Sequence, residues 1–562
     1  MSLVDPSSSP SLPARPPRPS ATLVVVREAA SGIEVLLSRR AERGDHNSGA
    51  WVFPGGLVDP GDRLAHACCE GLDDAAASAR LGVRDGGLDF FIAAVRECFE
   101  ESGLLFAVGE GGSLVELEDD AATRVAPWRT ALHRGERTLS GFCSELGLRL
   151  AVDRLIYLSH WITPLGRLKR FDTRFFLAIA PPGQNAVHDG TEMVEQMWVR
   201  PADALLESAA LKLLTPTQKT LELMTRFRTV AALLGWAASP RKVVLTVPRV
   251  GSGRQGTRPV LPDEPAWAEI GRVDPEGRGL HSYDINPETT VRLSPRLLRV
   301  TADNGSVMTG PGTNTYLIGG GVSNEWAVID PGPLSETHVD AVLAAAPGPI
   351  RWIFATHTHL DHSPATALLK TRTGATVHGL ASLNREWQDA TFDPEVILRG
   401  GERIELPGDS TLRVIHTPGH ASNHLCYLLE EEKMLFTGDH VMQASTVVIN
   451  PPDGDMAAYI ASLRALLSED LDWLAPGHGF LMAEPRVAIE WIIDHRLKRE
   501  SKVVDALKAR SVATAEALLP TVYDDVPERL HPMALRSLRA HLDKLKTDGR
   551  AGESEGNWQL TV

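Results

Sequence analysis

The stretch FATHTHLDHSPAT, residues 354–366, places three histidines and an aspartate within six positions of one another. The residues just before them, RWIFAT, predict a buried strand, so the cluster would lie in the loop where that strand leaves its sheet. Such loops are where α/β proteins bind ligands. Imidazole and carboxylate groups are common metal ligands. The four candidate ligands are His357, His359, Asp361 and His362.

Three later turns repeat the pattern of an apolar strand followed by a glycine and a metal-binding side chain. They are HTPGH, LFTGDH and LAPGHG, which supply His420, Asp439 and His478. The glycine directly before each of these residues would let the backbone turn sharply there. Convergence of the strand ends would gather seven metal-binding side chains in one place.

Seven imidazole and carboxylate groups are enough for two zinc ions that share a bridging ligand and a bridging water. Zinc lowers the pKa of a bound water to near neutrality, and a second zinc ion polarises the carbonyl or phosphoryl oxygen under attack. The cluster therefore predicts a hydrolase. Isolated histidines more often fill core or surface positions, and we assign that role to His416, His424 and His440.

HTHLDH and the three later ligands resemble the complete ligand set of the metallo-β-lactamase fold superfamily. This resemblance implies an αββα sandwich with a two-zinc site. The first zinc ion would be held by His357, His359 and His420. The second would be held by Asp361, His362 and His478. Asp439 would bridge the two ions, and Asp361 would also take part in catalysis.

Further stretches are similar to the β-lactamase-like protein 2 branch of this superfamily, including its C-terminal helical domain. They are GPGTNTYLIG, AVIDPG, FTGDH, APGHG and DHRLKRE, and the resemblance covers about 293–562. Ser363 and Pro364 predict the cap and first residue of a helix that follows the histidine cluster. With Ala365 they replace the glycine pair common after this motif, which leaves the substrate class open.

A second set of candidate ligands lies on a predicted helix, FFIAAVRECFEESG. Apolar side chains recur there at helical spacing and define a buried stripe. Glu97, Glu100 and Glu101 are three and four positions apart, so their carboxylates share one neighbourhood of the helix. A hard divalent cation, Mg²⁺ or Mn²⁺, would neutralise them and leave room for substrate phosphates. The alternative is a solvated acidic face.

The context of this helix, WVFPGGLVDPGD followed by RECFEESGL, resembles the Nudix box. By that match Gly56 belongs to the cofactor-binding loop, and Arg96 and the three glutamates belong to the catalytic helix. Asp62 stands where the family usually has glutamate, and 33 residues separate it from Arg96, far more than usual. An aspartate can still pair with Arg96. The lengthened box, with RFDTRFFLA and WVRPADAL, is similar to the coenzyme A diphosphatase type of Nudix protein. This resemblance covers about 21–235.

These motifs divide the chain into several α/β regions, as its 562 residues also suggest. We expect a disordered tail over 1–20, which is rich in Ser and Pro, and a Nudix α/β/α sandwich over 21–240. A linker or junction over 241–292 would follow. We expect the metallo-β-lactamase domain over 293–495 and a small winged-helix-like domain over 496–562.

Composition limits the class of protein. The formal charge of −15 disfavours a general nucleic-acid binder, although residues 536–550 carry a local excess of basic groups. That segment is better explained as a solvated helix face or a lid. The five cysteines lack the spacing of a zinc site or a disulfide framework. Neither a secretory signal nor a membrane span is evident, so we expect a cytoplasmic protein.

Two functional predictions follow, with a non-catalytic scaffold disfavoured by the intact ligand set. The first is a bifunctional hydrolase, in which a two-zinc site cleaves a thioester or other acyl substrate and the Nudix domain cleaves a nucleotide or coenzyme A diphosphate. The second is a zinc-dependent endoribonuclease that acts on single-stranded RNA, with the Nudix domain recognising a nucleotide or serving only as a retired binding module.

Overall fold

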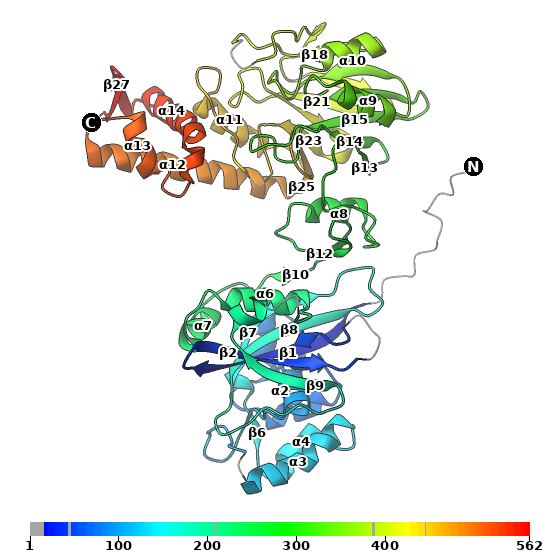
Figure 1. The fold of residues 1–562 in the computed structure, drawn as a ribbon, viewed down its shortest axis with the longest axis vertical. Coiled ribbons are helices and arrows are strands. Elements are labelled where there is room, and N and C mark those ends of the chain that lie inside the picture. The colour runs from blue at the N-terminus through cyan, green and yellow to red at the C-terminus, as the bar shows by residue number, and fades with distance from the viewer. Residues whose placement is uncertain are drawn as a thin grey trace. The chain divides into compact units, whose positions relative to one another are not determined.

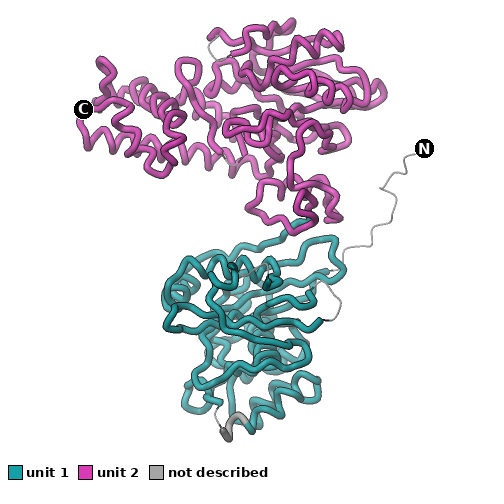
Figure 2. The backbone as a smooth tube through the Cα atoms, viewed as in Figure 1, with its two compact units in different colours: residues 1–250 teal, residues 251–562 magenta. Residues whose placement is uncertain are grey.

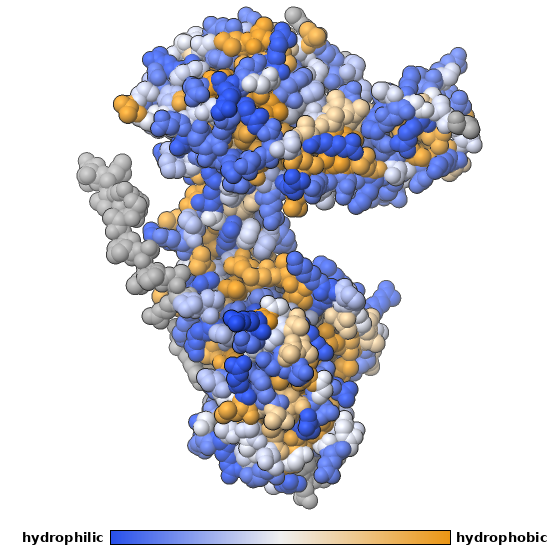
Figure 3. Space-filling view, turned by 180° about the vertical axis from the view of Figure 1, so that it is seen from behind, coloured by the Kyte–Doolittle hydropathy of each residue, from blue (hydrophilic) through white to orange (hydrophobic). Residues whose placement is uncertain are grey.

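The computed structural model describes residues 16–42, 47–117, 119–206, 210–384, 388–443 and 445–561. The chain divides into two compact units, residues 1–250 and 251–562 (Figure 2). Strand β1 begins at Arg18, inside the segment 1–20 that we predicted as a disordered tail, and residues 1–15 of that segment lie outside the described residues. On the face drawn in Figure 3, hydrophobic residues lie in separate patches among hydrophilic ones.

The first unit is built on an eight-stranded mixed sheet with the order β10-β7-β8-β1-β2-β3, in which β4 also pairs with β1 and β9 with β2. Strands β1 and β8 run parallel in its centre. The run ATLVVV puts apolar side chains on both faces of β1, so both faces can be covered. The strands are β1 (Arg18–Ala29), β2 (Gly32–Arg40), β3 (Trp51–Val52), β4 (Gly55–Leu57), β7 (Ile156–Ile162), β8 (Phe171–Ile179), β9 (Met193–Val199) and β10 (Leu245–Thr246).

Helix α2 (Gly87–Ser102) covers one face of this sheet, and α6 and α7 lie on the other side (Figure 1). The apolar stripe predicted on α2 is buried, which confirms the helical period read from the sequence. The other elements of the unit are η2 (Asp62–Cys68), α1 (Asp74–Leu81), β5 (Ala107–Val108), α3 (Asp119–His133), α4 (Leu139–Leu146), β6 (Arg149–Leu150), η3 (Val152–Arg154), α5 (Pro201–Leu206), α6 (Thr215–Met224) and α7 (Val230–Ala238).

Two sheets pack face to face in the second unit, and their inner side chains form one apolar core. The seven-stranded sheet runs β13 (Thr290–Ser294), β14 (Leu297–Thr301), β15 (Asn314–Gly320), β16 (Glu325–Ile329), β17 (Ile350–Phe354), β18 (Thr376–Gly379) and β19 (Val396–Ile397). The six-stranded sheet runs β20 (Arg403–Leu406), β21 (Ser410–His416), β22 (Leu425–Leu429), β23 (Met434–Gly438), β24 (Trp473–Pro476) and β25 (Met482–Ala483).

Helices cover the outer face of each sheet, which completes the expected αββα sandwich. Helices α9 (Glu336–Ala345) and α10 (Thr366–Thr373) pack on the seven-stranded sheet. Helices α11 (Met456–Leu466) and α12 (Pro485–Arg510) pack on the six-stranded sheet, where η4 (Glu430–Glu432) joins β22 to β23. The predicted buried strand before the histidine cluster is β17, so the cluster does lie where a central strand leaves its sheet.

The segment predicted as a linker, 241–292, contains folded elements. After β10 come β11 (Arg249–Gly251), β12 (Arg258–Val260) and α8 (Trp267–Val273). Glu269 of α8 is fully buried and accepts hydrogen bonds from the Arg299 guanidinium, at 2.6 and 3.0 Å, and from the backbone N–H of Leu481 at 2.8 Å. This buried acid therefore fastens the segment from about residue 251 onward to the αββα sandwich.

The C-terminal part combines three helices with a small sheet. Helix α12 runs without a break across the boundary that we predicted at 495 and 496, so this part shares a helix with the sandwich. The rest consists of β26 (Ala513–Thr514), α13 (Ala515–Val522), η5 (Glu528–Leu530), α14 (His531–Thr547), β27 (Ala551–Ser554) and β28 (Asn557–Leu560), with the strand order β26-β28-β27. Within the ranges that the structure describes, no helix is both long enough and apolar enough to cross a membrane.

Candidate metal centres

The structure brings the seven predicted zinc ligands together in two neighbouring groups. The ligand atoms within each group all lie within 4.8 Å of one another. The first group is His357, His359 and His420. The second group is Asp361, His362, Asp439 and His478. They come from the loop after β17 and from the turns that follow β21, β23 and β24, so convergence of strand ends assembles them.

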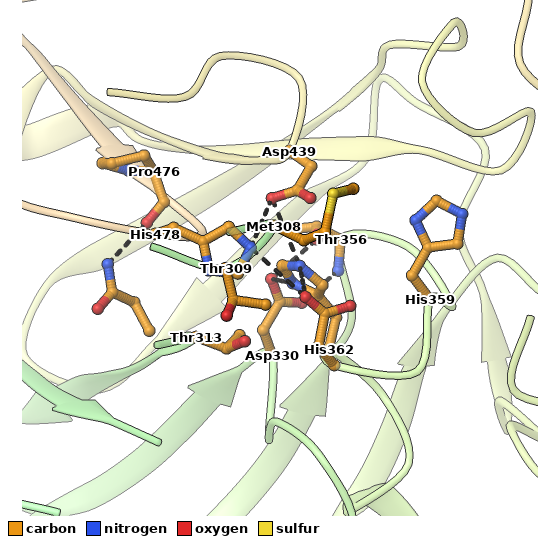
Figure 4. Close-up of polar contacts among 12 residues, drawn as sticks. Met308, Thr309, Thr313, Asp330, Thr356, His359, His362, Asp439, Pro476 and His478 are labelled. Atoms are coloured by element: carbon orange, nitrogen blue, oxygen red, sulfur yellow. Dashed lines mark hydrogen bonds and ion pairs between the residues drawn. The ribbon is translucent and has the colours of Figure 1, made fainter. Parts of the chain in front are cut away.

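Asp439 lies between the two groups (Figure 4). Its Oδ1 is 3.4 Å from His362 Nε2 and 3.2 Å from His478 Nε2. Its Oδ2 is 3.7 Å from His420 Nε2, in the other group. One carboxylate thus faces both groups with different oxygens, which is the geometry that a bridging ligand requires.

Hydrogen bonds at Nδ1 orient four of the histidines, namely His357, His362, His420 and His478. The Nδ1 atoms of His420 and His478 donate to the backbone carbonyls of Val448, at 2.9 Å, and Gly312, at 3.1 Å. His362 Nδ1 donates to a carboxylate oxygen of Asp330 at 2.9 Å. In each ring the Nε2 lone pair then points towards the cluster, because a hydrogen bond from Nδ1 fixes the tautomer and the ring orientation of a metal-binding histidine.

Asp330 is a functional residue that our sequence reasoning missed. It follows β16, is buried, and accepts hydrogen bonds from the backbone N–H of Thr356 at 2.7 Å and from its hydroxyl at 2.8 Å. Because that hydroxyl donates to Asp330, it can only accept from Nδ1 of His357, 3.0 Å away. Asp330 therefore orients His357 and His362 together. The stretch AVIDPG contained the signal, an isolated acid at the end of an apolar strand.

Buried ligand atoms without hydrogen-bond partners show that the cluster fits metal ions. Among the described residues, Nε2 of His357, His362 and His478 and Oδ1 of Asp439 are buried and form no hydrogen bond, although Asp439 Oδ1 lies 3.2–3.4 Å from two of these nitrogens. Leaving such atoms unpaired costs about 1–3 kcal/mol each, and coordinated cations would pair them. Burial, reinforced by His362 and the other neighbouring histidines, holds the pKa of His357 well below its usual value, so its ring is neutral and able to coordinate.

The opposite electrostatics apply at the acidic end of the cluster. Burial alone would lower the pKa of His478, but the carboxylates of Asp439 and Asp361 raise it to about 9. Without a metal ion this ring would carry a proton, whose positive charge offsets part of the negative charge of the two acids. A bound cation would replace that proton, because metal ligation requires the deprotonated imidazole.

The glycines before the ligands act in two ways. Gly419 and Gly438 have φ of +146° and +44°, so they make the sharp turns that we predicted. Gly477 has an ordinary φ and serves close packing instead. A Cβ atom there would lie 2.8 Å from His362 Cε1 and 2.9 Å from Asp439 Oδ1, inside normal contact distance.

The three histidines that we assigned to core or surface roles lie outside both groups. His416 is exposed, with its Nε2 3.2 Å from the carbonyl of Ser422. His424 and His440 are buried behind the cluster, and the His424 ring stacks on His357 with centroids 5.0 Å apart. The predicted helix cap at Ser363 is wrong. Helix α10 begins three residues later, because the Ser363 hydroxyl donates to Asp389 at 2.8 Å.

A second polar site lies at the α2 helix of the first unit. Arg96 forms a two-pronged ion pair with Asp62, at 2.7 and 3.1 Å, so the pairing expected across the long insertion is confirmed. The same guanidinium reaches Glu97 Oε1 at 2.9 Å and Glu100 Oε2 at 3.6 Å. Gly56 packs against Glu97, where a Cβ atom would lie 2.4 Å from the carboxylate.

The three predicted glutamate ligands share one side of α2 but do not form a closed cation site. Among the described residues, the only groups of three or more potential ligands whose ligand atoms all lie within 4.8 Å of one another are the two histidine and aspartate groups. Arg96 contacts two of the glutamates, Glu97 and Glu100, while Glu101 accepts a hydrogen bond from the Gly55 N–H at 2.9 Å. Burial raises the pKa of Glu100 to about 7 and that of Glu101 well above its usual value. This is a carboxylate donor set of the kind that hard cations bind.

The fold and the two sites define the class of protein: a metal-dependent hydrolase with a Nudix fold joined to an αββα sandwich. The chain belongs to the metallo-beta-lactamase superfamily. The model of that superfamily matches residues 308–478. The models for the beta-lactamase associated winged helix domain and for the NUDT19 Nudix domain match residues 514–558 and 83–224. The last match begins after the loop that contains Gly56.

Similar proteins include curated relatives and solved structures. The chain is 31% identical over 254 residues to an atrochrysone carboxyl ACP thioesterase from Aspergillus chevalieri, covering 43% of this chain and 78% of that one. It is 30% identical over 277 residues to a beta-lactamase-like protein 2 homolog from Drosophila melanogaster, covering 46% and 90%. A NUDIX hydrolase structure from Alicyclobacillus acidocaldarius is 26% identical, with a TM-score of 0.34, covering 39% of this chain and 96% of that one.

Proposed function

We propose that the chain is a bifunctional hydrolase. Its metallo-β-lactamase domain would cleave a thioester or related acyl substrate with two zinc ions, and its Nudix domain would cleave a nucleotide or coenzyme A diphosphate with Mg²⁺ or Mn²⁺. The observation that carries the first activity is the pair of ligand groups joined by Asp439. The thioesterase name of a relative at 31% identity supports the acyl substrate.

The ligand groups would divide as the sequence predicted. His357, His359 and His420 would hold one zinc ion. Asp361, His362 and His478 would hold the other, with Asp439 shared. When bound, such ions lower the pKa of a water molecule and polarise the carbonyl oxygen of the substrate. The chain's own residues fix the ligands in place, since each oriented ring is anchored at Nδ1.

Asp361 differs from the other ligands in its access to solvent. Its side chain is 27% exposed and lines an open cleft of about 880 Å³, whereas the side chain of Asp439 is 11% exposed. A carboxylate at the mouth of the site can accept a proton from an attacking water and return it to a leaving group. We therefore assign Asp361 a catalytic role in addition to coordination.

The Nudix activity rests on the residues of α2. Glu97, Glu100 and Glu101 would hold the cation. Arg96 would position Glu97 and Glu100. Gly56, which has no side chain, lets its loop pack directly against Glu97. Because burial raises the pKa of Glu100 to about 7, its carboxylate is only about half ionised near neutrality, and cation binding would complete its ionisation. A diphosphate substrate would supply the remaining oxygen ligands.

A parallel assay tests both activities. Zinc-loaded protein is incubated with a panel of acyl-coenzyme A thioesters and with single-stranded RNA, and the products are identified by mass. Thioester cleavage that disappears in Asp439→Asn supports the proposal. Cleavage of RNA without thioester turnover would contradict it in favour of an endoribonuclease, and that activity should fall steeply with added salt. A separate Mg²⁺ reaction with coenzyme A and nucleotide diphosphates tests the Nudix domain.

A further inference from the structure

The cleft at the metal cluster extends to the C-terminal helices, and its two ends differ in chemistry. One end is formed by the cluster residues, with Val307, Met308 and Leu360 beside them. These three apolar side chains are 78%, 48% and 59% exposed, so they offer apolar surface beside the metal cluster. The other end is formed by α12, α14 and the segment 523–530 between α13 and α14, and contains the arginines of the cleft.

Arg496 of α12 is a buried cation without a carboxylate partner among the described residues. It is 3% exposed and lines the cleft. Its guanidinium donates to the carbonyl of Val447 and stands over the ring of Tyr459, 5.6 Å from the centroid, while its Nε has no hydrogen-bond partner among those residues. A buried charge with no counter-ion is costly, so an anion in the cleft would stabilise it.

Two neutral groups on the same wall also have unpaired polar atoms. The hydroxyl of Tyr523 and Nδ1 of His495 are buried and lack partners among the described residues, and both side chains line the cleft beside Arg496. Two neighbouring arginines already have carboxylate counter-ions. Arg499 pairs with Asp525 at 2.7 Å, and Arg539 pairs with Glu516 at 2.7 Å. Unlike these two arginines, Arg496 carries a positive charge that no carboxylate among the described residues compensates.

We infer that Arg496, Tyr523 and His495 form an anion subsite that binds the phosphate of a small thioester carrier, with the acyl group at the apolar end of the cleft. Arginine and hydroxyl groups are the usual partners of phosphate oxygens. The inference rests on the proposed thioester hydrolysis and deepens it. It specifies a phosphorylated carrier, such as 4′-phosphopantetheine, as the part of the substrate that is recognised.

The distribution of charge favours a small carrier over RNA. A nucleic-acid strand needs basic groups along its whole path, because each nucleotide carries a phosphate. Here the arginines gather at one end, whereas Asp453 and exposed apolar side chains lie along the rest of the cleft. One phosphate at one end matches this arrangement.

Calorimetric binding to the zinc-loaded full chain tests the subsite without relying on turnover. We expect 4′-phosphopantetheine to bind roughly 10- to 100-fold more tightly than pantetheine, which lacks the phosphate. Arg496→Met should abolish this preference, and Arg496→Lys should restore part of it. Arg486→Met, an exposed arginine on the same helix, should keep it in full. Equal affinity of wild-type protein for the two compounds would overturn the inference even if Arg496→Met does not fold.

Further arms separate the possible outcomes. If single-stranded RNA binds in an Arg496-dependent manner and 4′-phosphopantetheine does not, the small-carrier assignment is wrong. If S-acyl pantetheine and its phosphorylated form are cleaved with equal KM, the subsite is wrong although the hydrolase stands. If phosphate-dependent binding persists but no thioester is cleaved, the subsite stands and the proposed function fails.

Discussion

Substitution of Asp330 by asparagine tests how the metal ligands are held in place. The carboxylate accepts three hydrogen bonds, from the N–H and hydroxyl of Thr356 and from Nδ1 of His362, at 2.7–2.9 Å. Asparagine keeps one acceptor oxygen but replaces the other with an NH₂ group, which would face a hydrogen-bond donor. Nδ1 of His362 then loses its hydrogen-bond acceptor unless the ring changes tautomer. The Thr356 hydroxyl is also freed to rotate, which releases His357.

The expected effect is a loss of metal affinity of about 10- to 100-fold, the usual cost of removing such a contact, which corresponds to about 1.4–2.8 kcal/mol. Titration of zinc against a competing chelator measures it, with circular dichroism to verify folding. Asp340→Asn, an exposed acid on α9, should leave affinity unchanged. A folded Asp330→Asn protein that binds zinc within about threefold of wild type would refute the positioning role.

Three further substitutions probe the cluster, the 251–292 segment and the Nudix helix. Gly477→Ala should lower zinc content in elemental analysis without replacing any ligand, because the new methyl group would collide with His362 and Asp439. Glu269→Gln should destabilise the second unit by roughly 3–5 kcal/mol in calorimetric scans, since it leaves Arg299 buried without its partner. Glu100→Gln should lower Mg²⁺-dependent diphosphate cleavage by about 100-fold or more.

The Glu269 effect should depend on pH in a defined direction. Burial would raise the pKa of this carboxyl, but Arg299 and His281 lower it to about 2, below its value of about 4.3 in an unfolded chain. The stabilisation is therefore complete above about pH 5 and is lost as the pH falls towards 2. The difference in unfolding free energy between wild type and Glu269→Gln should shrink over that range. A constant difference would contradict the assignment.

Matched controls accompany the other two substitutions. Gly552→Ala places a methyl group in the same unit as Gly477 at an ordinary contact distance, 3.9 Å, from the methyl group of Thr561, and should not change zinc content. Glu145→Gln removes an exposed acid from α4 of the first unit and should leave diphosphate cleavage intact. Equal losses in variant and control would mean that the effects are not specific to the sites.

The ligand set could be predicted from sequence because its signals are local. Each ligand follows an apolar strand and a turn, and strand ends of a layered α/β fold meet at one edge. Asp330 escaped prediction because its role depends on a hydrogen bond to a histidine 32 positions later in the chain. The attachment of residues 251–292 to the sandwich could not be predicted for the same reason. It depends on Glu269, in a segment of weak periodicity, pairing with Arg299 on β14.

The helix face on α2 shows the limit of spacing arguments. Helical period placed Glu97, Glu100 and Glu101 on one side, and the structure agrees. Spacing could not reveal that Arg96 would draw two of these carboxylates to itself, because side-chain direction depends on the Asp62 segment that packs across the helix.

Metal content of the purified full chain, measured by elemental analysis after dialysis against metal-free buffer, tests the central claim most directly. We predict two tightly bound zinc ions per chain, with about one lost in His357→Ala and both weakened in Asp439→Asn, where the shared carboxylate is gone. Zinc bound at two equivalents in both variants, or none bound by the folded wild-type chain, would contradict the claim that these seven side chains enclose a pair of metal ions.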